Sequence, residues 1–290
     1  MTRPIVVGVD GSSEALQAVD WAVDEARYRR SPVRIVHIAL RWEYSAGAPP
    51  EPGLDAARPE AAALHVLELA EERARERAPE VEVSTRLGIG HVPRTLLEEA
   101  HDAVLLAVAS RGTGAFSGIM LGSVSRQVAE HATCPVVVVP HHTDPEPRHA
   151  EVVVGVDGSE ASMNAVGFAL EAAATRQAGV RALHVWEHSA APRAARPASY
   201  SEVSVDQEGM RLLVESLAPW KRKYPTVPVV EQVVQGRTPT EALSAATVRA
   251  ALLVVGARGH GGFSGLRLGS VSHAVLQQAQ GPVAVVHSGS

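Results

Sequence analysis

The 290-residue sequence contains a single cysteine, Cys134, so a disulfide within the chain is excluded. Cys134 comes just before a run of valines, where we expect a buried structural thiol. No apolar run approaches the roughly 20 residues that a membrane-spanning helix needs. A strand-like pattern begins at Ile5, which leaves no room for a signal peptide. We therefore expect a cytoplasmic protein with no membrane partner.

Runs of lysine and arginine are also missing. The chain has 27 Lys and Arg residues against 32 Asp and Glu residues, a formal net charge of −5. A nucleic-acid backbone calls for a basic face. The nearest candidate, residues 27–30, lies at the end of an expected helix, where cations suit the negative end of the helix dipole. The sequence thus argues against a nucleic-acid partner.

What the sequence does contain is a long internal repeat. Residues 6–12, Val-Val-Gly-Val-Asp-Gly-Ser, return unchanged as residues 153–159. Residues 121–125, Leu-Gly-Ser-Val-Ser, return as residues 268–272 at the same offset of 147. A period this long indicates a duplicated domain and not a solenoid. We place the domains at residues 1–142 and 150–290, joined by a polar, proline-rich linker at residues 140–150.

Each half alternates short apolar runs with helical patterns, which predicts an α/β fold. We expect two tandem Rossmann-like domains, each with a five-stranded parallel sheet in the order 3-2-1-4-5 and helices on both faces. The expected strands of the first half are residues 5–9, 33–39, 81–87, 104–108 and 136–139, and its expected helices are residues 13–29, 56–78, 93–100 and 123–131. The expected strands of the second half are residues 152–156, 180–185, 227–234, 252–255 and 283–287. Residues 44–59 and 189–200 are expected to form loops.

Two segments of each half are expected to meet beyond the carboxyl ends of the strands, where open α/β sheets bind ligands. One is the turn after the first strand, with Asp10 or Asp157. The other is a glycine-rich loop that follows the fourth strand and opens a helix. Glycines let the backbone approach an anion, and the unpaired N–H groups of a helix start can bind it. No lysine follows the glycines, so this is not a Walker loop.

In the second half the loop reads Gly-x2-Gly-x9-Gly-Ser, with Gly256, Gly259, Gly269 and Ser270 at the fixed positions. With this motif and the Val-Gly-Val-Asp-Gly-Ser turn, the chain resembles tandem universal stress proteins over nearly its whole length. Its arginine-dominated basic residues and abundant alanine resemble actinobacterial members. The resemblance implies an ATP-binding regulatory protein of the stress response, with Mg²⁺ accompanying the nucleotide.

The resemblance also implies which residues would bind ATP. Asp10 and Asp157 would lie at the ribose and adenine end, backed by Gly8 and Gly155, while Ala39 and Trp186 would line the adenine pocket. The phosphates and their surroundings would be held by Ala109, Arg111, Gly112, Gly122, Ser123 and Val124 in the first half and by Gly256, Arg258, Gly259, Gly262, Gly269, Ser270, Val271 and Ser272 in the second.

The two loops are not identical. Ala109 stands where the second half has Gly256, and Ala115 stands where it has Gly262. If either position needs a left-handed backbone, the methyl group costs about 1–2 kcal/mol. If the position needs only a small residue, alanine costs little. Both readings remain open at this point.

Binding is favoured over catalysis, so we expect no catalytic residue and no metal ligated by the protein. Phosphoryl transfer needs metal ligands and a positioned nucleophile, and we find no carboxylate that matches the phosphate loop. His37 and His184 fall inside apolar strands, where hydrogen-bonded core imidazoles are expected. A slow ATPase or nucleotide-transfer enzyme is the alternative, and a dimerising scaffold without a ligand is a third.

Assembly is expected to follow from the duplication. The fifth strands of the two sheets are apolar edges that need covering, so we predict that they pair in an intramolecular pseudo-dimer. A homodimer of the whole chain is also expected. The sequence does not identify a regulatory protein partner.

Overall fold

The computed structural model describes residues 2–40, 59–112, 121–141, 151–186, 202–259 and 267–289. The chain divides into two compact units, residues 1–141 and 142–290, and each unit is treated by itself. Gly262, Ala115 and the predicted linker and loops lie wholly or mostly outside the described residues. Among the helices that the structure describes, none is long and apolar enough to cross a membrane.

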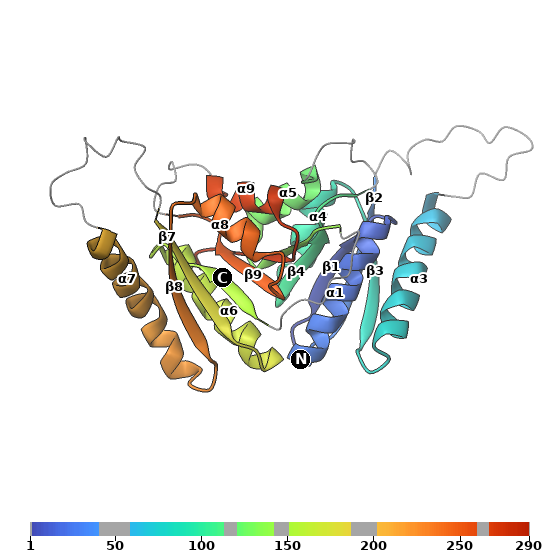
Figure 1. The fold of residues 1–290 in the computed structure, drawn as a ribbon. Helices are drawn as coiled ribbons and strands as arrows, with labels where there is room; N and C mark the ends of the chain where they lie inside the picture. The colour runs from blue at the N-terminus through green and yellow to red at the C-terminus, as the bar shows by residue number, and fades with distance from the viewer. Residues whose placement is uncertain are drawn as a thin grey trace, which may run out of the picture. The chain divides into compact units, whose positions relative to one another are not determined.

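The first unit is a five-stranded parallel sheet with helices between its strands (Figure 1). The order across the sheet is β3-β2-β1-β4-β5. Every residue of β4 and β5 is buried, so helices cover both faces of these strands. The elements are β1 (Ile5–Val9), α1 (Ser13–Arg29), β2 (Val33–Ala39), α3 (Pro59–Arg77), β3 (Val83–Ile89), α4 (Val92–Glu99), β4 (Leu105–Ala109), α5 (Ser123–His131) and β5 (Val136–Val139).

The second unit repeats this architecture strand for strand. Its order is β8-β7-β6-β9-β10, which corresponds to 3-2-1-4-5 in the first. The predicted α/β class, the parallel sheet and the strand order are therefore confirmed. The elements are β6 (Val152–Gly155), α6 (Glu160–Arg176), β7 (Val180–Trp186), α7 (Glu202–Lys223), β8 (Val229–Gln235), α8 (Pro239–Ala246), β9 (Leu252–Gly256), α9 (Ser270–Gln278) and β10 (Val283–Val286).

The first helix of each unit begins at a capping serine. The Ser12 hydroxyl accepts the N–H of Ala15 at 3.1 Å, and Ser159 accepts that of Ser162 at 3.2 Å. Both helices end on a residue in the left-handed conformation, Arg30 or Gln177. The helix predicted at residues 13–29 has these bounds.

The third strand was predicted two residues too early in both halves. Residues 81–87 and 227–234 were expected, whereas β3 is Val83–Ile89 and β8 is Val229–Gln235. Val81 instead closes a turn, donating its N–H to the Ala78 carbonyl at 3.1 Å. Pairing with the neighbouring strand decides where these half-exposed edge strands begin, and the apolar pattern of the sequence does not carry that register.

Cys134 is buried, as expected for a structural thiol. Burial raises the pKa of its thiol to about 11. The group therefore stays protonated at neutral pH and is a poor nucleophile.

We predict that the stability of the second unit depends on the inner face of α7. Leu213 is fully buried, whereas its neighbour Val214 is 49% exposed. Leu213→Ala should lower the free energy of unfolding by about 2–5 kcal/mol because it leaves a cavity. Val214→Ala on the same helix should change it by less than about 0.5 kcal/mol. Urea denaturation followed by circular dichroism measures both, and equal losses would show that α7 is packed differently.

Candidate functional site

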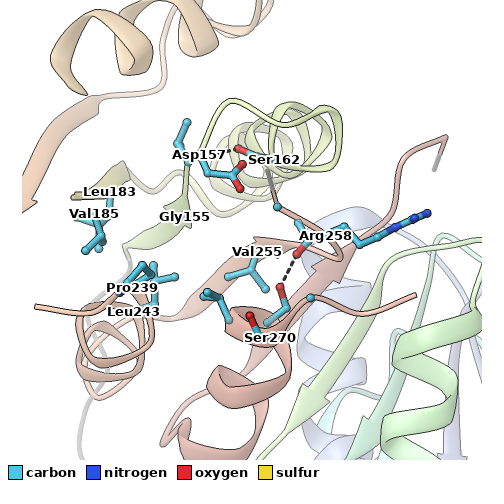
Figure 2. A pocket seen from close by; sticks show the side chains of 16 residues that line it. Gly155, Asp157, Ser162, Leu183, Val185, Pro239, Leu243, Val255, Arg258 and Ser270 are labelled. Atoms are coloured by element: carbon cyan, nitrogen blue, oxygen red, sulfur yellow. Dashed lines mark hydrogen bonds between the residues drawn. The ribbon is translucent and has the colours of Figure 1, made fainter. Parts of the chain in front are cut away.

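Each unit has one cavity at the carboxyl ends of its first and fourth strands. Its volume is about 440 Å³ in the first unit and about 280 Å³ in the second. The position is the switch point of the sheet, since β1 pairs with β2 on one side and with β4 on the other. Figure 2 shows the second cavity, with Asp157 and Ser162 at one end and Ser270 near Arg258.

The aspartate after the first strand is held by the serine that caps the next helix. Asp157 Oδ1 accepts the Ser159 N–H at 3.0 Å and the Ser159 hydroxyl at 2.6 Å. Asp10 Oδ1 accepts the corresponding bonds from Ser12 at 3.1 and 2.6 Å. Each carboxylate is therefore oriented before any ligand arrives, because its serine is itself fixed by the helix start.

The other oxygen of each carboxylate faces a glycine of the loop after the fourth strand. A Cβ atom built on Gly112 would overlap Oδ2 of Asp10, and one built on Gly259 would overlap Oδ2 of Asp157. Neither glycine is in the left-handed conformation. A close approach to the carboxylate, and not backbone conformation, is thus what requires glycine here.

The opposite end of each cavity is the start of the last helix. The N–H of Gly122 donates to the Ser110 carbonyl at 2.7 Å, and that of Gly269 donates to the Ala257 carbonyl at 2.7 Å. These glycines are the N-caps of α5 and α9, and no side chain among the described residues caps either helix. The first-turn N–H groups and the positive end of the helix dipole are therefore directed at the cavity, an arrangement suited to phosphate.

Most of the predicted site residues border the two cavities. In the first unit they are Gly8, Asp10, Ala109, Arg111, Gly112, Gly122, Ser123 and Val124. In the second they are Gly155, Asp157, Gly256, Arg258, Gly259, Gly269, Ser270, Val271 and Ser272. The Ser272 hydroxyl donates to the Gly256 carbonyl at 2.7 Å, so it ties α9 to the end of β9. Gly262 lies outside the described residues.

Ala39 and Trp186 were predicted to line the pocket, but neither is among the residues that border the two cavities. The residues near the end of the second strand that do border them include Ile38 and Leu40 in the first unit and Leu183 and Val185 in the second.

Several residues that border the cavities were missed, and three of them shape the sites. Leu96 of α4 and Leu243 of α8 form part of the apolar wall, and Gly8 and Gly155 make room for them. Leucine on the inner face of an amphipathic helix was the available signal. The third is Ser162, whose hydroxyl accepts the Asp157 N–H at 3.1 Å (Figure 2). Its counterpart is Ala15, so this bond exists in only one unit.

The strand histidines are hydrogen-bonded, as the sequence suggested. Nδ1 of His37 lies 2.8 Å from the Val9 carbonyl oxygen, and Nδ1 of His184 lies 2.8 Å from that of Val156. A carbonyl can only accept, so Nδ1 carries the proton and donates it. His37 also borders the first cavity.

The structure decides between the two readings of Ala109. Neither Ala109 nor Gly256 has a positive φ, so the left-handed explanation is wrong and the position needs only a small residue. A Cβ atom built on Gly256 would lie 2.8 Å from the backbone of Ala161 and Ser162. The start of α6 thus packs directly on β9, and Ala109 indicates a slightly wider spacing in the first unit.

Electrostatics and metal chemistry at the sites are simple. Each cavity combines one aspartate with one arginine. Over the described ranges, no group of three or more His, Cys, Asp or Glu side chains is arranged to hold a metal ion. The arrangement can orient a polar ligand through the carboxylate and bind an anion through backbone N–H groups.

Comparisons with known proteins agree over both halves of the chain. The universal stress protein family matches residues 1–140 and 150–287. A universal stress protein of Mycobacterium tuberculosis (strain ATCC 25618 / H37Rv) is 37% identical, with 97% of this chain and 95% of the relative covered. One from Mycolicibacterium smegmatis is 36% identical, with 97% and 96% covered.

A solved structure supports the fold. The crystal structure of a universal stress protein from Archaeoglobus fulgidus superposes with a TM-score of 0.62 at 19% identity. The match covers 98% of this chain and 96% of that one. At this identity the likeness concerns the fold alone.

We predict that the two small residues at the end of the fourth strand are not interchangeable. Gly256→Ala should lower the stability of the second unit by about 1–3 kcal/mol because its methyl group meets the backbone of α6. The matched change Ala109→Gly should cost at most about 1 kcal/mol. Thermal unfolding of both variants tests this, and a harmless Gly256→Ala would mean that α6 has room to move.

Proposed function

This chain belongs to the universal stress protein family, and on that premise we propose that each half binds one ATP molecule, with Mg²⁺, as a regulatory ligand. The observation that carries the proposal is the pairing, within one cavity, of an oriented aspartate and an uncapped helix start. A ligand that satisfies both has hydroxyl groups at one end and phosphates at the other.

The cavity walls fit the parts of such a ligand in order. The apolar side chains of Ile38 and Leu96, or of Val185 and Leu243, suit the flat face of a base. The aspartate suits ribose hydroxyls, because a carboxylate accepts hydrogen bonds. The start of α5 or α9 and the nearby Arg111 or Arg258 suit the phosphates. Mg²⁺ would offset the charge of the phosphates, which are its usual ligands.

The residues that border each cavity suit a regulatory role better than catalysis. Each cavity offers one oriented carboxylate, and Ser159 or Ser12 already occupies one of its oxygens. A ligand held by both the first and last crossovers of a unit would stabilise the folded, closed form over any more open one. We propose that a partner protein in the cytoplasm recognises the closed form that the ligand stabilises. Pairing of the β5 and β10 edges and a homodimer of the chain remain part of the proposal.

Two matched substitutions test the binding sites. Gly122→Asp or Gly269→Asp places a carboxylate at the N-cap, where it would satisfy the first-turn N–H groups and repel phosphate. Both glycines have backbone angles open to any residue. A Cβ atom on Gly269 would make only ordinary contacts, whereas one on Gly122 would lie 3.3 Å from the Ser110 carbonyl oxygen, which must move by a few tenths of an ångström. By equilibrium dialysis, we expect two ATP molecules per wild-type chain, one for either Asp variant and none for the double variant.

The alanine variants Gly122→Ala and Gly269→Ala are the controls, since they add the carbon without the charge. Both should still bind two ATP molecules. Absence of ATP from the wild-type chain, or two ATP molecules on the double Asp variant, would overturn the proposed sites.

A second prediction separates binding from turnover. Wild-type protein incubated with Mg-ATP should release phosphate more slowly than about once per minute per site, because no described residue that borders either cavity is placed as a nucleophile with metal ligands beside it. Faster release that is lost in the double Asp variant would make the protein an enzyme. Release that the double variant retains would indicate a contaminant.

A further inference from the structure

Beside its cavity, within reach of the charge of Arg111, the first unit carries an acidic side chain, Glu14, that the second unit lacks at the same place. Glu14 lies in the first turn of α1, directly before Ala15, which borders the first cavity. The second unit has Ala161 at this place in α6. The acidic residue in the first turn of that helix is Glu160, one position earlier, and it is exposed.

The backbone places this position close to the end of the fourth strand. In the second unit, a Cβ atom built on Gly256 would lie 2.8 Å from the carbonyl carbon of Ala161 and 3.1 Å from its Cβ. Gly256 borders the cavity and is followed two residues later by Arg258 of the phosphate loop. Because the first unit repeats this architecture, Glu14, the counterpart of Ala161, lies next to the end of β4 at Ala109 and close to Arg111.

Glu14 is held as a charged group. Its own backbone N–H and the Ser13 hydroxyl, which donates to Oε2 at 2.9 Å, lower the pKa of its carboxyl. His141 and Arg111 add a smaller attraction. Its side chain is only 26% exposed, so solvent screens its charge less than it would on an open surface.

Two basic side chains act on Glu14, those of His141 and Arg111. His141 Nδ1 lies 3.8 Å from Glu14 Oε1, an ion pair that exists only when His141 is protonated. Gln17 Nε2 lies 3.5 Å from the same ring nitrogen. The first cavity is bordered by Asp10 and Arg111, with the negative charge of Glu14 beside it, whereas the second is bordered by Asp157 and Arg258.

We infer that Glu14 makes the first site select nucleotides of lower phosphate charge than the second site does. The inference rests on the proposed nucleotide binding and names the ligand class of each site. Repulsion between Glu14 and a phosphate chain grows with each added phosphate, while contacts to base and ribose are unaffected. The second site prefers the triphosphate, whereas the first site binds mono- and diphosphates with almost the same affinity as the triphosphate.

The test isolates the first site in the full chain with Gly269→Asp and compares Glu14 with Glu14→Gln. Affinities for ATP, ADP, AMP and adenosine are measured by calorimetry at low salt. We expect Glu14→Gln to tighten ATP by roughly three- to tenfold, ADP by less and AMP least, and to leave adenosine unchanged. The gain for ATP should shrink in 0.5 M salt, where the Debye length is short.

Glu160→Gln is the matched control, made in the Gly122→Asp background that isolates the second site. It should leave all four affinities unchanged. An equal change for all four ligands on Glu14→Gln would make Glu14 structural, and no change would remove it from the site; either overturns the inference. Failure of all four ligands to bind either background would instead overturn nucleotide binding itself.

Discussion

In each unit, an aspartate carboxylate occupies the space that a side chain on the facing glycine would need. Asp10 meets Gly112 and Asp157 meets Gly259. The contact joins the crossover after the first strand to the crossover after the fourth, which the sheet order makes neighbours. The serine that fixes the carboxylate also starts the first helix. Strand order and helix capping therefore meet at this one contact, which sets the shape of the cavity between the two crossovers.

The repeats keep this contact and differ in what surrounds it. The Ser162 hydroxyl accepts the Asp157 N–H, a bond that Ala15 cannot make. The same helix turn carries Ala161 in one unit and Glu14 in the other. The small residue at the end of the fourth strand, Gly256 or Ala109, limits how closely the first helix of the unit can approach that strand. Duplication has thus preserved the geometry of the site while its charge and packing diverged.

Repetition of short motifs was sufficient to predict the duplicated domain, alternation of strand and helix patterns predicted the parallel sheet, and most of the predicted site residues border the cavities. The capping serine and the apolar periodicity placed α1 at its observed bounds. Ile38 and Val185, which border the cavities, were not singled out because the face that a strand residue occupies depends on register. Glu14 was overlooked because an acidic residue in the first turn of a helix is usual. Its importance depends on the proximity of β4, which only the folded chain provides.

The account depends on phosphate binding at the starts of α5 and α9. A crystal structure of the full chain grown with ATP and Mg²⁺ tests this most directly. The account predicts ribose hydroxyls against Asp10 or Asp157 and phosphate oxygens within hydrogen-bonding distance of the first-turn N–H groups of α5 or α9. A nucleotide whose phosphates point away from these helix starts, or that binds outside both cavities, would contradict it.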